Sequence, residues 1–163
     1  MTTRRRNWHR RAMPEISLYE FAGGAPALLR LAAAHHQRCL DDPALNHPFS
    51  HAGQNPDHVV RLAAYWGEVL GGPPTFTRIA GGQSAMLELH ARMGAEDDLG
   101  ARFVDCFVQA ADDAGLPGDP DFRQALRDYM QWAVEDVMRY SPKDSVVDPG
   151  LAVPHWSWDG RQA

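Results

Sequence analysis

Apolar residues recur three or four positions apart in five segments of the chain, and glycine or proline separates these segments. Such spacing places the apolar side chains on one face of a helix, whereas a half-buried strand would alternate apolar and polar positions. The pattern therefore predicts an all-α protein. Substantial helices are expected over residues 25–40, 55–70, 95–114 and 120–140, and a short helix within residues 83–94.

The second predicted helix has clear chemical signals at both ends. Asn55 is a good N-cap, and Pro56 suits the first helical position because its missing N–H would have no partner there. The run Gly71–Pro74 ends the helix. Residues 75–82 that follow are predicted to be a glycine-bearing connection.

One domain is expected over residues 15–141, with a flank on each side. A chain of 163 residues is long enough for one domain with a substantial core. Residues 1–14 form a basic arm with five arginines and no acidic residue, which we predict to be disordered. Residues 142–163 form a tail punctuated by proline and glycine. We expect its two tryptophans, Trp156 and Trp158, to dock on the domain.

Charge and cysteine content narrow the function classes. Without the five arginines of the arm, the chain has 11 basic and 21 acidic residues, which gives a net charge near −10. An acidic domain is unsuited to nucleic acid, and no apolar run reaches the roughly 20 residues needed to span a bilayer. Cys39 and Cys106 fit neither a disulfide framework nor a zinc site. We expect two buried free thiols, as in a reducing cytoplasm.

Three histidines on three predicted helices each lie beside apolar residues. His90 follows Met86 by four positions, so the two share a helix face. His58 precedes Leu62 by four positions, and His36 lies within the apolar pattern of the first predicted helix. An apolar pocket with one fixed imidazole and further imidazoles opposite is a typical way to hold haem.

With these histidines in view, residues 18–141 resemble the truncated haemoglobins, specifically group II, whose fold is a two-over-two helical sandwich around haem. Four ordered segments carry the resemblance: LYEFAGGAPALLRLAAAHHQRCLDDPAL, HPFS, HVVRLAAYWGEVLGGPP and MLELHARMG. They are similar to the glycine-pair entry with its second helix, the aromatic loop, the distal helix and the proximal helix of that family. The resemblance implies haem b, iron protoporphyrin IX, as the cofactor.

The resemblance assigns roles to individual residues. His90 matches the proximal iron ligand, and His58 matches the distal residue nearest a bound gas. Leu62 is the apolar residue one turn further, and Phe49 packs on the porphyrin. The remaining pocket positions show two departures: His36 stands where many group II members have tyrosine, and Phe103 where they have tryptophan. The second change removes a hydrogen-bond donor.

Other residues complete the predicted haem site. We expect His90 Nδ1 to donate to a carbonyl one turn back, which leaves Nε2 for iron. Met86 and Leu87 would pack against the porphyrin edge, and Arg61 would pair with a haem propionate. Phe76 would line the pocket. His35, about 100° from His36 on the helix, is expected to face another surface.

The resemblance favours a protein that binds oxygen, carbon monoxide or nitric oxide at haem iron, and leaves transport, sensing and detoxification open. A redox enzyme, acting as a nitric oxide dioxygenase or on peroxide, would need a separate reductase because the chain has no G-x-G-x-x-G fingerprint. Two other classes are a non-haem metal-binding bundle and a haemless interaction module. Each of these function classes is compatible with a protein that forms an oligomer. Neither flank contributes a candidate ligand, so we expect both to be dispensable for haem chemistry.

Overall fold

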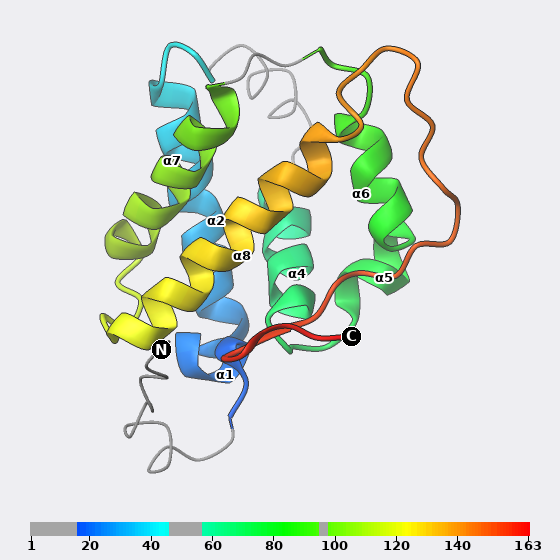
Figure 1. Ribbon diagram of the computed structural model, residues 1–163. Helices are drawn as coiled ribbons and strands as arrows, with labels where there is room; N and C mark the ends of the chain where they lie inside the picture. Colours follow the sequence, from blue (N-terminus) through cyan, green and yellow to red (C-terminus); the bar gives the residue numbers. More distant parts are fainter. Residues whose placement is uncertain (1–15, 46–56, 95–97) are drawn as a thin grey trace, which may run out of the picture.

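Within residues 16–45, 57–94 and 98–163, the parts of the chain that the computed structural model describes, helices form nearly all the regular structure (Figure 1). The only strands there are two residues long and pair with each other in the tail. The elements are α1 (Leu18–Ala22), α2 (Gly24–Asp41), α4 (His58–Val69), α5 (Thr75–Ala80), α6 (Gln83–His90), α7 (Leu99–Asp113), α8 (Pro120–Met138), β1 (Trp156–Ser157) and β2 (Gly160–Arg161).

Four long helices form two layers around the core. α2 packs on α4 in one layer and on α7 of the other layer, where α7 packs on α8 (Figure 1). The apolar stripes predicted from the sequence face one another in this arrangement. Their largest fully buried side chains include Leu28, Leu31, Val69, Phe107, Phe122, Tyr129 and Met130. The all-α prediction and the two-over-two sandwich are confirmed.

The boundaries of the long helices follow from local chemistry. Asp119 caps α8, because its side chain accepts a hydrogen bond from the Phe122 N–H at 2.9 Å. The turn after α4 requires Gly72, where a Cβ would lie 2.7 Å from the carbonyl oxygen of Gly67 and 2.8 Å from the Tyr19 ring. The predicted cap of α4, Asn55 with Pro56, lies outside the described residues, and α4 itself begins at His58.

Two short helices were not predicted. α1 is one turn before the glycine pair, and α5 forms within residues 75–82, where a connection was expected. A buried carboxylate stabilises the start of α5: Glu68 on α4 accepts hydrogen bonds from the backbone N–H of Thr77, at 2.9 Å, and from its hydroxyl. This partner comes from another helix, so the sequence pattern of the segment alone does not indicate it.

The C-terminal tail lies on the helical body, and both tryptophan rings contact it as expected. Trp156 is buried and its ring centroid lies 5.7 Å from that of Tyr129. Trp158 packs edge-on against Phe21 at 4.9 Å, and its indole N–H donates to the carbonyl of Ile16 at 2.9 Å. Among the described residues, no helix has the length and apolar character needed to cross a membrane.

Candidate functional site

His90 is the last residue of α6, and its side chain is exposed. Its Nδ1 lies 2.8 Å from the carbonyl oxygen of Met86, one turn earlier. Because a carbonyl can only accept, this hydrogen bond places a proton on Nδ1, and in the neutral ring the lone pair is then on Nε2. The contact has the arrangement that the sequence predicted for a metal-binding imidazole.

His36 on α2 and His58 at the start of α4 form a pair of imidazoles. Their ring centroids lie 5.2 Å apart, and both side chains are half-buried. Burial lowers the pKa of both rings, and the pKa of His58 is lowered further by His36 and His90. Both rings are therefore neutral near pH 7. Nε2 of His58 is buried and has no hydrogen-bond partner within the described residues. A buried polar atom of this kind suggests a ligand or water beside it.

His35 lies on a different face of α2 from His36, as expected, but this face is fully buried, which the sequence did not indicate. Its ring centroid lies 4.4 Å from that of Phe103 and 5.3 Å from that of Trp66. α2 packs between α4 and α7, so a rotation of about 100° from His36 leads to a second buried face. Burial lowers the pKa of His35 to about 3, with smaller contributions from His36 and His58, so the ring is neutral at pH 7.

The other predicted site residues differ in exposure. Leu87 and Phe76 are buried, the latter against the Tyr65 ring at 5.0 Å. The predicted propionate partner, Arg61, is exposed on α4. Three further members are half-buried: Leu62, Met86 and Phe103. Phe49 lies outside the described residues, so its predicted contact with the porphyrin remains a prediction.

A buried polar network that the sequence analysis missed joins α4 to α6. The hydroxyl of Tyr65 donates to Gln83 Oε1 at 2.7 Å, and Gln83 Nε2 donates to Asp136 on α8 at 3.4 Å. Burial raises the pKa of Tyr65, which therefore keeps its proton. Gln83 begins α6 and is itself buried, so the network fixes the start of the helix that ends at His90. The isolated polar residues gave no periodic signal for it.

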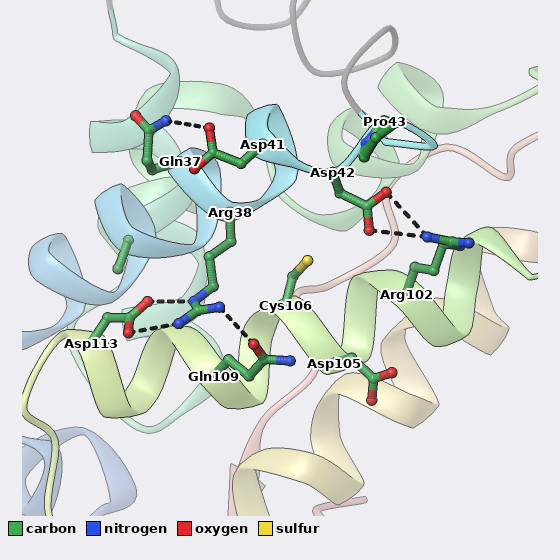
Figure 2. A pocket seen from close by; sticks show the side chains of 11 residues that line it. Gln37, Arg38, Asp41, Asp42, Pro43, Arg102, Asp105, Cys106, Gln109 and Asp113 are labelled. Carbon is green, nitrogen blue, oxygen red and sulfur yellow. Dashed lines mark hydrogen bonds and ion pairs between the residues drawn. The ribbon is translucent and has the colours of Figure 1, made fainter.

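A surface cavity of about 990 Å³ lies between α2 and α7 (Figure 2), and neither His36 nor His58 lines it. Both of its arginines bond to carboxylates: Arg38 bonds to Asp113, and Arg102 bonds to Asp42 at 3.3 Å. Cys106 lies between these ion pairs, and its partner in a small apolar cluster is Cys39. Both cysteines are buried free thiols, as predicted.

The donor groups favour haem over a metal bound by protein alone. No group of three or more His, Cys, Asp or Glu residues in the described ranges is arranged to hold a metal ion. This disfavours the non-haem bundle. A haem iron needs one imidazole from the protein, and an imidazole with Nδ1 bonded to a carbonyl suits that role. The buried Nε2 of His58 would then have a ligand to contact.

The fold and these residues define a truncated globin. The model of the family described as bacterial-like globin matches residues 17–138. The chain therefore belongs to the bacterial-like globin family, which implies a haem cofactor. The resemblance to truncated haemoglobins that four ordered segments of the sequence carry is confirmed. No curated protein matches the chain.

Solved haemoglobin structures share this fold. A haemoglobin from Chloroflexus aurantiacus is 24% identical with a TM-score of 0.64, covering 76% of this chain and 98% of that one. The group II truncated haemoglobin from Bacillus anthracis is 18% identical with a TM-score of 0.67, covering 77% and 92%. A thermostable haemoglobin from Thermobifida fusca is 27% identical with a TM-score of 0.60, covering 75% and 96%.

Proposed function

We propose that this globin binds oxygen and other diatomic gases at the iron of haem b, with His90 as the proximal ligand. The observation that carries the proposal is the contrast between His90, whose Nδ1 is bonded to a carbonyl, and the neutral pair His36 and His58. One side offers a lone pair for iron. The other offers imidazole N–H groups for a gas molecule.

Ferrous haem would supply the reversible binding of the gas. The chain would supply the surroundings: His90 orients its Nε2 through the bond to Met86, and the buried Leu87 is proposed to pack against the porphyrin edge. His58, with its buried Nε2, is the favoured donor to the gas, and His36 the alternative. Arg61 is proposed to pair with a propionate. The remaining apolar contacts would come from Phe49, Leu62, Phe76, Met86 and Phe103.

Titration of the purified protein with haem tests the proposal. We expect binding at one haem per chain, a Soret band, and recovery of unmodified haem b on acid extraction. The ferrous form should bind carbon monoxide and release oxygen reversibly. A folded protein that shows no saturable haem binding, or whose ferrous form does not respond to either gas, would contradict the proposal.

The two distal imidazoles also support a second candidate, a redox enzyme. Nitrate would form from nitric oxide, oxygen and one electron, or water from peroxide, two electrons and two protons. Two neutral N–H groups could hold the reactants or donate protons in either reaction. The electrons would come from a separate reductase. Nitric oxide consumption by the ferrous oxygenated protein, followed with and without a reductant, distinguishes this candidate from a simple carrier.

We also propose that the protein is located in the cytoplasm, where its two buried thiols would stay reduced.

A further inference from the structure

The tail bonds to the first turn of α6. The hydroxyl of Ser84 donates to the carbonyl oxygen of Asp148 at 2.6 Å and accepts from the N–H of Leu151 at 2.9 Å. The N–H of Gln83 donates to the Leu151 carbonyl at 3.1 Å. The tail comes so close that a Cβ at Gly82 would lie 3.3 Å from this carbonyl oxygen. One serine side chain therefore joins α6 to two points of the tail.

The chain after α8 also bonds to the segment that follows His90. The N–H of Arg92 donates to the Tyr140 carbonyl at 2.7 Å, and that of Gly94 donates to the Ser141 carbonyl at 3.0 Å. The Arg92 guanidinium donates to the Ser145 carbonyl at 3.0 Å. Arg92 has a φ of 61°, a left-handed conformation uncommon for a residue with a side chain. These bonds hold the chain in that conformation two residues after His90.

Apart from the bonds of Gln83 to Tyr65 and Asp136 at its first residue, α6 has little support from the other helices. It is eight residues long, and a helix of that length is unstable by itself in water. No other described helix or strand packs extensively on it. Figure 1 shows the chain after α8 running along the outer side of α6 before it crosses toward α1. The tail is itself fixed to the body, because Val147, Val153 and Trp156 are buried.

We propose that residues 140–151 are a positioning segment for α6, which holds both ends of the helix so that the His90 ring keeps its orientation. The inference rests on the proposed role of His90 and extends it. It lies beyond the family match, which ends at residue 138. It also revises the expectation that the tail is dispensable for haem chemistry.

The side chain of Ser84 allows a test in the full-length protein. Ser84→Ala removes both side-chain bonds to the tail, and Ser84→Thr keeps a hydroxyl as the conservative rescue. Ser157→Ala is the matched control, because the Ser157 hydroxyl also takes part in two hydrogen bonds. It accepts them from Asp159 and Gln162, and both stay within the tail. Three quantities are measured: hydrogen exchange of the α6 amides, the iron–imidazole stretching band of the ferrous protein, and the rate of haem release.

We expect Ser84→Ala to speed exchange in α6, to shift or broaden the iron–imidazole band, and to release haem roughly three- to tenfold faster. Ser84→Thr should restore all three, and Ser157→Ala should change none. If Ser84→Ala leaves the band and haem release unchanged, or if Ser157→Ala has equal effects, the positioning role is overturned. A wild-type ferrous protein without an iron–imidazole band would instead contradict the proximal role of His90, and exchange in α6 would still report whether the tail holds the helix.

Discussion

The two sides of the candidate haem site are built in different ways. On the proximal side, His90 is exposed, and its hydrogen bond to Met86 and the hydrogen bonds between α6 and the tail orient it. On the distal side, His36 and His58 lie between packed helices, and burial keeps both rings neutral. The proximal side therefore depends on hydrogen-bond geometry, and the distal side on desolvation. Changes on each side should alter different measurements.

The largest effect is expected on the proximal side. His90→Gly removes the proposed iron ligand, so haem should be released at least about 100-fold faster, since even partners of a ligand account for 10–100-fold in metal affinity. Haem transfer to an excess of an apoglobin acceptor measures the rate. His155→Gly, at an exposed histidine of the tail, is the control and should release haem as the wild type does. Equal rates of haem release in the two variants would show that His90 does not hold the haem and would contradict its proximal role.

Distal substitutions should alter gas binding while haem stays in place. His58→Leu removes the favoured donor, so oxygen release should speed up by about one to two powers of ten, since a hydrogen bond to a partly charged group is worth ~1.5–3 kcal/mol. Release of carbon monoxide, which carries less negative charge, should change less. His36→Leu, measured in parallel, shows how much the second imidazole contributes to holding bound oxygen. If neither variant speeds oxygen release relative to carbon monoxide release, the distal role of the pair is wrong.

A low-spin ferric spectrum that becomes high-spin in His58→Leu would show that His58 binds the iron directly when no gas is present. The buried Nε2 of His58 fits either a donor or a ligand. The spectrum therefore distinguishes the two roles without depending on the oxygen measurement.

Acid should destabilise the distal side through His35. Its pKa is lowered from 6.5 to about 3, so its contribution to stability is complete above pH 6.5 and is lost as the pH falls toward 3. At pH 5 the loss is about 2 kcal/mol. His36 and His58, whose pKa values are also lowered, act in the same direction. Urea unfolding at pH 7 and pH 5 should give a smaller difference for His35→Leu than for wild type. An equal difference in both proteins would show that His35 is not the group that titrates.

The smallest change in a measured property is expected for a substitution at the contact between the tail and α1, away from both sides of the site. Trp158→Phe keeps an apolar ring against Phe21 but loses the N–H bond to Ile16. The free energy of unfolding should fall by about 1 kcal/mol. The iron–imidazole band should not change, because this contact does not reach α6. A shifted band would mean that the whole tail, and not residues 140–151 alone, acts on the proximal side.

The sequence was sufficient to predict the long helices and the proximity of His36 to His58. Apolar stripes of α2, α4, α7 and α8 have a clear period, and their ends have strong breakers, so local rules suffice. The same period places His36 and His90 on apolar faces. The contact between His90 and the Met86 carbonyl follows from helix geometry, because four residues make about one turn.

What the sequence did not predict depends on contacts between distant segments. α5 needs Glu68 from another helix, His35 is buried because α2 has two packed faces, and Ser84 meets residues more than 60 positions later. None of these contacts has a period or a spacing that reading along the chain would detect. The sequence therefore predicted the candidate ligands of the site but not the contacts that support them.

Rescue of His90→Gly by free imidazole tests the central claim most directly. The ferrous variant, reconstituted with haem, is measured by resonance Raman spectroscopy with and without imidazole, natural and ¹⁵N-labelled. We expect the wild-type iron–imidazole band to be absent from the variant, to return with added imidazole and to shift with the label. A variant that keeps the wild-type band without imidazole would show that another residue holds the iron, and would contradict the account.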